Sequence, residues 1–342
     1  MTDINLPEVP ADWTPRVPLS GDSIRPPGSK PMFPHVVDST MISAFRSCPQ
    51  KAYRSYVEHW KPQNESVHLV AGGAFASGIE AAREAYFVDG KTHFDDYTAI
   101  GIRRLIEKYG HFEPPSTGSG AAKTCERMVG ALEYYFEQYP LGADGLTPLK
   151  FPNGKFAIEF GFAEPLPIIH PESGQPILFA GRADMLGEFA GGRYSVDEKT
   201  TSSLGASWGR QWEMRSQFTA YNWAARQAGI PLDGTIVRGI SILKTKYETL
   251  EVLTYRPDWE IDRWLAQTCR DIKRMIACWE AGYWDWSLDA ACTEYGGCSF
   301  ATVCKSQDPM TWLPMYFEKR VWDPLQRQEI SVAEWESQWE AD

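Results

Sequence analysis

Several features that would place the chain in a membrane, in the secretory pathway or among P-loop motors are missing from the sequence. It contains no run of about 18 apolar residues, which is the least that a membrane-spanning helix needs. Its first residues, MTDINLPEVPADW, are acidic and broken by proline, unlike a secretory signal. No G-x-x-x-x-G-K-[ST] motif is present, so the sequence predicts no intrinsic ATP-driven motor. We expect a cytoplasmic protein without membrane contact.

Positive charge is also scarce. The chain holds 45 Asp and Glu against 34 Lys and Arg, which gives a formal net charge of −11. A protein that binds nucleic acid without sequence preference needs positive charge where it meets the phosphates. The total charge argues against such a protein, although it is compatible with a local basic groove.

Cysteine is too unevenly distributed for a framework of disulfides. The count of seven is odd, and no secretory signal accompanies it. Three of the seven, Cys292, Cys298 and Cys304, fall within thirteen residues near the C-terminus. This group needs an explanation other than disulfide pairing.

Apolar residues, in contrast, are abundant enough for a sizeable core, since they make up 43 % of the 342 positions. Their spacing changes along the chain and indicates an α/β fold, with a mixed central sheet flanked by helices. We divide the chain into a proline-rich arm (1–37), a helical part (38–150), a core (151–256), and a C-terminal part with a helix, a cysteine-rich segment and an acidic tail (257–342).

Within these parts the patterns predict individual elements. Helical spacing covers 38–60, with a break at Cys48–Pro49, and also 72–87, 96–109, 121–139, 206–228 and 257–281. Alternation of apolar and polar residues predicts strands at 155–164, 177–189, 193–199, 235–243 and 248–255. Gly191–Gly192 separates two of these strands and predicts a hairpin turn.

One of the predicted hairpin strands ends in the charged stretch SVDEKTTSS. The period of two puts Asp197 and Lys199 on one face of this strand and Glu198 on the other. Asp184, on the preceding strand, can lie beside Asp197. Two carboxylates and an ammonium at one end of a sheet suit a hard cation such as Mg²⁺ or Mn²⁺ that also binds a phosphate. The alternative is an ordinary ion pair on an exposed hairpin.

The helix predicted at 206–228 adds a polar stripe. Gln217 and Tyr221 are four residues apart and share one face, and Arg210 lies two turns earlier on roughly the same stripe. In a chain with 13 % aromatic residues, a buried tyrosine is the alternative interpretation of Tyr221.

The ordered set G-x-x-D (Gly181–Asp184), D-x-K-T (Asp197–Thr200) and Q-x-x-x-Y (Gln217–Tyr221) resembles the RecB-like branch of the PD-(D/E)XK nucleases. The resemblance implies a restriction-endonuclease-like core. It implies Asp184 and Asp197 as metal ligands that take part in catalysis and Lys199 as the catalytic lysine. Gln217 and Tyr221, with Arg210, would bind and orient the substrate backbone.

The upstream helix motif of the family is incomplete here. Relatives carry a metal-binding His three residues after a Gly and a Glu four residues after the His. Counted from Gly73, the His position is Ala76, whereas the Glu is present as Glu80. Glu80 is therefore a further candidate metal ligand, and a water or Glu80 would replace the missing imidazole.

The cysteine group has its own resemblance. Five residues separate each neighbouring pair of Cys292, Cys298 and Cys304, a wider spacing than structural zinc usually shows. With Cys48 as a fourth ligand, the pattern resembles RecB-like nucleases with an iron–sulfur staple, such as the AddB subunit, the CRISPR adaptation nucleases and phage exonucleases. It implies a 4Fe–4S cluster that joins the N- and C-terminal helical parts. Structural Zn²⁺ and buried free thiols, as expected for Cys125, Cys269 and Cys278, are the alternatives.

Together these resemblances imply a metal-dependent DNA nuclease, an exonuclease that acts at DNA ends in phage or bacterial recombination or repair. DNA would be its partner, along with a single-strand annealing or replication/recombination protein. The alternative is a catalytically silent scaffold on the same fold that binds DNA or protein. Ala76 and the charge of −11 favour the scaffold, whereas the intact Asp184, Asp197 and Lys199 favour the enzyme.

Overall fold

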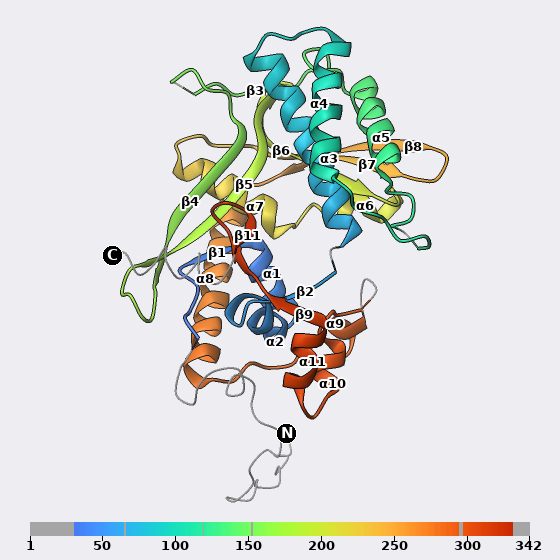
Figure 1. Cartoon of the computed structure of the whole chain (residues 1–342). Helices are drawn as coiled ribbons and strands as arrows, with labels where there is room; N and C mark the ends of the chain where they lie inside the picture. The colour runs from blue at the N-terminus through green and yellow to red at the C-terminus, as the bar shows by residue number, and fades with distance from the viewer. Residues whose placement is uncertain (1–30, 65, 119, 152, 294–296, 331–342) are drawn as a thin grey trace, which may run out of the picture.

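A mixed sheet forms the centre of the molecule (Figure 1). The computed structural model describes residues 31–64, 66–118, 120–151, 153–293 and 297–330. Within these residues seven strands form one sheet: β1 (Val36–Asp38), β3 (Thr147–Pro148), β4 (Ile158–Ile169), β5 (Pro176–Phe189), β6 (Gly192–Thr201), β7 (Gly234–Ile242) and β8 (Tyr247–Tyr255). The mixed sheet predicted from the sequence is thereby confirmed.

The order of the strands is β1-β5-β6-β7-β8, and β3 and β4 also pair with β5. Strands β1 and β6 run parallel to their neighbours β5 and β7, and the other pairs are antiparallel. The predicted hairpin joins β5 to β6 through Ala190 and Gly191, both with positive φ (50° and 85°). Such a turn matches the twist of the two strands, so it fixes their register.

Two groups of helices cover the sheet. On one face lie α3 (Val67–Arg83), η2 (Glu84–Val88), α4 (Phe94–Tyr109) and α5 (Cys125–Gln138), whose apolar side chains pack with Ile240 and Ile242 of β7. On the other face lie α1 (Ser39–Ser47), α2 (Pro49–Ala52), α6 (Ala206–Arg210), α7 (Ser216–Gln227) and α8 (Asp258–Ala281). None of the helices in the described ranges is both long and apolar enough to cross a bilayer.

The C-terminal part folds back onto the segment that follows α1. It contains α9 (Ala290–Thr293), α10 (Ala301–Lys305), α11 (Pro309–Tyr316), β9 (Phe317–Lys319), β10 (Val321–Asp323) and β11 (Gln328–Ile330). Strand β9 pairs with β2 (Trp60–Pro62), which follows η1 (Tyr53–Val57), and β10 and β11 form a hairpin. The sequence patterns did not predict these short strands, and the predicted acidic tail from residue 331 onward lies outside the described residues.

Two predictions near the N-terminus and in the middle of the chain differ from the structure. The arm predicted at 1–37 lies mostly outside the described residues, but Val36 and Val37 at its end belong to the buried strand β1. The predicted helix 206–228 is wrong as a single helix, because it is interrupted between α6 and α7. At this interruption Arg256 Nη2 donates a hydrogen bond of 2.6 Å to the carbonyl of Trp212.

Candidate active site

The ends of strands β5 and β6 bring two acidic side chains together. The last residues that pair between these strands are Met185 and Val196, so the next position on each strand is an aspartate, Asp184 and Asp197. The backbone N–H of Glu198 donates a hydrogen bond of 3.2 Å to Asp184 Oδ2. Lys199 forms an ion pair with Asp197 Oδ1, on the face of the strand that period-two alternation predicts. The three residues of the D-x-K and G-x-x-D motifs therefore form one cluster.

Glu198 lies on the opposite face and belongs to the core. Its carboxylate accepts hydrogen bonds from Arg83 Nη2 (2.5 Å) and Nη1 (3.2 Å) on α3, and from Tyr135 Oη (3.0 Å) on α5. Burial alone would raise the pKa of Glu198, but Arg83 outweighs it and the pKa is lowered. Asp197 and Glu198 are adjacent on β6, but their side chains lie on opposite faces of the sheet and have different surroundings.

The electrostatics of the two aspartates differ from those of Glu198. The pKa of Asp197, which is 1 % exposed, is raised to about 7, because burial and the nearby Asp184 raise it by more than Lys199 lowers it. Burial and the charge of Glu198 likewise raise the pKa of Asp184. One lysine does not neutralise two carboxylates that are withdrawn from water, so this pair favours a bound cation.

The donor atoms at this site suit a hard divalent ion. Carboxylate oxygens are the ligands that Mg²⁺ prefers, and it commonly takes one or two of them together with water and a phosphate. Asp184 and Asp197 would hold the ion. Glu80 is half-buried on α3 and close enough to Asp184 for that charge to raise its pKa, after the larger effect of burial. Ala76, one turn before Glu80, supplies no donor.

In the described part of the chain, no group of three or more His, Cys, Asp or Glu side chains is arranged to hold a metal ion. The candidate site thus consists of the two carboxylates of Asp184 and Asp197, and Glu80 as a third ligand stays a prediction. The ion pair between Lys199 and Asp197 occupies one of the carboxylate oxygens that a metal would use.

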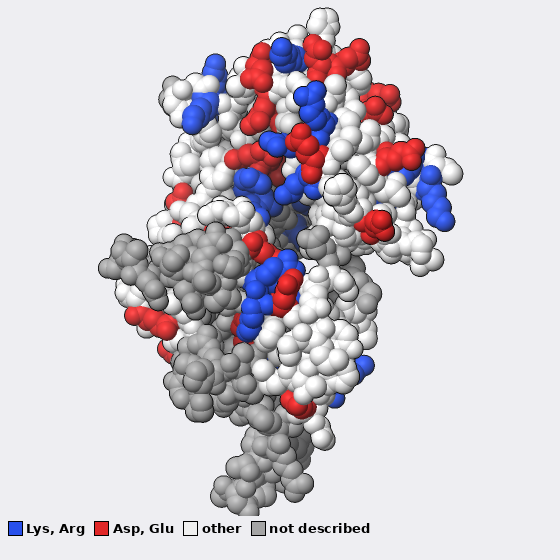
Figure 2. All heavy atoms as spheres, viewed as in Figure 1, with Lys and Arg blue, Asp and Glu red and all other residues white. Residues whose placement is uncertain are grey.

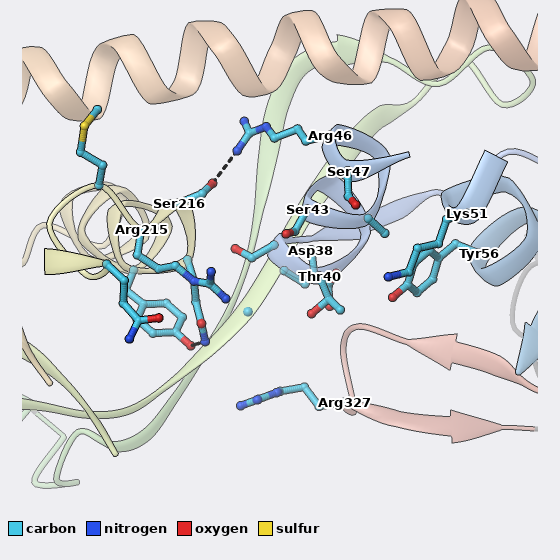
Figure 3. A pocket seen from close by; sticks show the side chains of 18 of the residues that line it. Asp38, Thr40, Ser43, Arg46, Ser47, Lys51, Tyr56, Arg215, Ser216 and Arg327 are labelled. Atoms are coloured by element: carbon cyan, nitrogen blue, oxygen red, sulfur yellow. Dashed lines mark hydrogen bonds between the residues drawn. The ribbon is translucent and has the colours of Figure 1, made fainter. Parts of the chain in front are cut away.

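A cavity of about 940 Å³ lies beside this cluster, between α1 and α7 (Figure 3). Gln217 and Tyr221 line it, and Gln217 Nε2 donates a hydrogen bond of 2.6 Å to Tyr221 Oη. Asp184 and Asp197 do not line the cavity themselves, but both are close enough to Tyr221 to raise its pKa after the larger effect of burial. Tyr221 therefore both lines the cavity and lies near the two carboxylates.

Arg210 also lines the cavity, but not as predicted. It is the last residue of α6, and the interruption after it separates Arg210 from the helix that carries Gln217 and Tyr221. The expected shared stripe on one helix is therefore wrong for Arg210. The packing of Trp208 against Trp212, with ring centroids 5.2 Å apart, positions α6 beside the cavity instead.

Several polar residues of the cavity escaped the sequence analysis. Ser39, Ser43 and Ser47 recur every four residues on the exposed side of α1, a helical stripe that could have been found by its period. Arg46, Lys51, Arg182, Arg215 and Arg327 add positive charge to the lining. Lys and Arg side chains gather around the hollow at the middle of the face in Figure 2. A locally basic cavity therefore exists in an acidic chain.

Two of these arginines already lie in contact with the carboxyl group of an acidic residue. Arg46 Nε lies 2.7 Å from Asp271 Oδ2, and Arg182 Nε lies 2.5 Å from Glu159 Oε2. Burial and the nearby Asp184 raise the pKa of Glu159 to about 8. Glu159 is thus a further acidic residue near the cluster of Asp184, Asp197 and Lys199. The sequence analysis did not identify it, because Glu159 on β4 belongs to no motif.

The four cysteines of the predicted iron–sulfur site come from different segments. Cys48 lies between α1 and α2, Cys292 on α9, Cys298 before α10, and Cys304 on α10. The pKa of Cys304 is raised to about 11, mainly by burial and to a smaller extent by the nearby Cys298, Cys48 and Cys292. The structure thus gathers the four side chains in one region, without the arrangement of a metal site.

One known family matches the sequence. The family model of the PD-(D/E)XK nuclease superfamily matches residues 39–305. A crystal structure named "Putative exonuclease" from Eubacterium rectale is 14 % identical with a TM-score of 0.42, and the match covers 76 % of this chain and 88 % of that one. The structure of SSO0001 is 12 % identical with a TM-score of 0.31, covering 79 % and 96 % of the two chains. No curated protein matches the sequence.

Proposed function

Because the chain belongs to the PD-(D/E)XK nuclease superfamily, we propose that it is a metal-dependent deoxyribonuclease that hydrolyses phosphodiester bonds at DNA ends. The observation that carries this proposal is the pair Asp184 and Asp197 beside Lys199, with Tyr221 close to both carboxylates and lining a basic cavity. The pair supplies the oxygen ligands, and the cavity supplies room and positive charge for a phosphate backbone.

The side chains of the site have different roles in the proposed hydrolysis. Mg²⁺ or Mn²⁺, when bound, lowers the pKa of a coordinated water and stabilises the charge that develops on the phosphoryl oxygens. Asp184 and Asp197 would hold this ion. The Lys199 ammonium positions the attacking water. Gln217 and Tyr221, which are hydrogen-bonded to each other, orient the backbone of the strand in the cavity.

The proposal is tested by titrating Mg²⁺ and Mn²⁺ with end-labelled linear DNA and with covalently closed circular DNA. We expect cleavage of the linear DNA that depends on the metal and stops when the metal is chelated. The circular DNA should persist if the enzyme needs an end. Release of mononucleotides or short fragments from the labelled end would identify the direction of digestion.

A catalytically silent protein that binds DNA is the second candidate, and Ala76 favours it. This residue stands where relatives have a metal-binding His, so the site has one fewer donor. The same assay separates the candidates. DNA binding without cleavage at any Mg²⁺ or Mn²⁺ concentration would support the silent protein and contradict the nuclease.

The finer assignment to the RecB-like branch depends on the motif set and on the cysteines. We propose that Cys48, Cys292, Cys298 and Cys304 bind a 4Fe–4S cluster that ties the segment after α1 to the C-terminal part. The proximity of Cys298, Cys48 and Cys292 to Cys304, which contributes to the raised pKa of Cys304 after the larger effect of burial, supports this proposal. A tie over so many residues removes much chain entropy from the unfolded state. A role in phage or bacterial recombination or repair, beside a strand-annealing partner, is part of the same proposal.

Substitution of Cys48 tests the cluster. Protein purified without oxygen should be brown, and Cys48→Ser should lose the colour, the iron and part of its thermal stability. The control is Cys125→Ser on α5, which packs with the helices of the other face and should keep the colour. One bound zinc in colourless protein would favour the zinc alternative. Native protein without metal, and with Cys48 freely alkylated, would contradict both.

A further inference from the structure

The hairpin β10–β11 carries an arginine at a fixed position in its turn. Arg327 has a φ of 55°, in the left-handed region, and precedes β11 directly. The turn is closed by Asp323, whose Oδ1 accepts hydrogen bonds from the backbone N–H groups of Leu325 (2.8 Å) and Gln326 (3.3 Å). Asp323 is itself buried. The backbone that presents Arg327 is therefore well defined.

The base of this hairpin is attached to the helical part of the molecule. Trp322 Nε1 donates a hydrogen bond of 2.8 Å to Asp38 Oδ2, at the start of α1. Arg320 Nη1 lies 2.8 Å from Glu329 Oε2, and the backbone N–H of Arg320 donates to the carbonyl of His59 (3.0 Å). The contacts with Asp38 and His59 join segments more than two hundred residues apart, so the hairpin is positioned by the fold rather than by its neighbours in sequence.

From this base the side chain of Arg327 extends across the cavity (Figure 3). Among the described residues, its guanidinium hydrogen-bonds a carbonyl rather than a carboxylate, with Nη1 3.3 Å from Arg182 O. Burial alone would lower the pKa of Arg327, but Tyr221, Asp184, Glu159 and Asp197 outweigh it and raise the pKa. The guanidinium therefore lines the cavity beside strand β5, bonded to the carbonyl two residues before Asp184, and among the described residues it forms no ion pair with a carboxylate.

We propose that Arg327 binds the phosphate group that is cleaved, holding it against Asp184 and Asp197. This inference rests on the proposed nuclease function. Arg327 lines the cavity whereas Asp184 and Asp197 do not, so a phosphate in the cavity can contact the guanidinium. A guanidinium has parallel N–H donors that fit two phosphate oxygens at once, and it keeps its charge at any physiological pH. Arg46 and Arg182 are less suited to this part, because the guanidinium of each already contacts the carboxyl group of an acidic residue.

The competing explanation is that Arg327 is a counter-ion for the two aspartates. The two explanations predict different variants. A counter-ion competes with the metal, so Arg327→Ala would cleave at lower Mn²⁺ concentrations and bind DNA as the wild type does. A phosphate ligand does not compete with the metal in this way, so its loss weakens the contact with DNA and the rate at saturating metal.

The experiment compares the wild type with Arg327→Ala and Arg327→Lys in two assays. DNA binding is measured in Ca²⁺, a metal expected not to support cleavage. Cleavage is measured in saturating Mn²⁺. We expect Arg327→Ala to bind an oligonucleotide about 10-fold more weakly, with a salt dependence reduced by about one charge. Its kcat should fall at least as much as its affinity. Arg327→Lys should recover part of the affinity, because it keeps the charge but loses the two parallel donors.

Arg193→Ala is the matched control, because Arg193 lies on the surface and pairs with Glu188. It should bind and cleave as the wild type does. Wild-type affinity, salt dependence and kcat in Arg327→Ala would overturn the inference and leave the nuclease function standing. Wild-type protein that binds DNA but does not cleave it would overturn the nuclease function, and the binding arm would still decide whether Arg327 contacts phosphate. Wild-type protein that does not bind DNA would overturn both.

Discussion

Asp197→Asn should abolish DNA cleavage while leaving the protein folded. The substitution removes one of two carboxylates that would hold the metal and replaces it with a neutral group of nearly the same shape. Mutation of residues that merely support metal ligands already lowers metal affinity or activity about 10- to 100-fold. The loss of a ligand itself should therefore lower cleavage more than about 100-fold. Lys199→Ala should reduce cleavage nearly as far, because the attacking water loses its positioning cation.

The folded state should tolerate Asp197→Asn because the carboxylate is a cost to folding in the absence of metal. Asp197 is buried, and burial raises its pKa to about 7, which means that its charged form is disfavoured in the folded protein. We therefore expect an unfolding temperature equal to or above that of the wild type without metal. With Mn²⁺, the wild type should gain stability and the variant should not.

Asp258→Asn is the control for this substitution. Asp258 is exposed at the start of α8 and pairs with Arg226, so the same chemical change there should leave cleavage intact. Cleavage by Asp197→Asn at the wild-type rate would show that the metal site has been assigned to the wrong residues. Loss of cleavage together with unfolding would mean that Asp197 is needed for the fold and not for the chemistry.

The sequence predicts the centre of this site well because its geometry is local. Gly191 lies between two strands whose alternation is clear, so the turn, the register and the proximity of Asp184 to Asp197 follow from about twenty consecutive residues. Likewise, Gln217 and Tyr221 lie four residues apart on one uninterrupted helix, and their side chains meet. Patterns with a period of two or 3.6 are sufficient for contacts of this kind.

The remainder depends on contacts between distant segments, which leave no periodic signal. Helix 206–228 is interrupted where Arg256, 44 residues after Trp212, binds the Trp212 carbonyl. Arg327 reaches the cavity because Trp322 contacts Asp38, 284 residues earlier. Strand β1 is three residues long and exists because it pairs with β5. None of these partners can be identified from the spacing of residues around them.

Changing Glu198, the neighbour of Asp197, to Gln should destabilise the folded protein, whereas Asp197→Asn should not. The Glu198 carboxylate is the ion-pair partner of Arg83, and both side chains are almost completely withdrawn from solvent. Removal of one member of a buried pair leaves an uncompensated charge in the core, which typically costs about 3–5 kcal/mol. We expect Glu198→Gln to lower the free energy of unfolding by that order, measured by urea denaturation with a folded baseline.

A double substitution tests whether the loss of stability comes from the unpaired charge of Arg83. Replacing both partners with apolar residues of similar size, Arg83→Met with Glu198→Leu, should recover much of the lost stability, because no buried charge is then left unpaired. Glu188→Gln, whose partner Arg193 is on the surface, should change stability little. If Glu198→Gln alone were as stable as the wild type, the ion pair would not support the sheet. If this variant nevertheless cleaved DNA more slowly, the effect would have to arise from a shift of the Glu198 backbone N–H, which donates a hydrogen bond to Asp184.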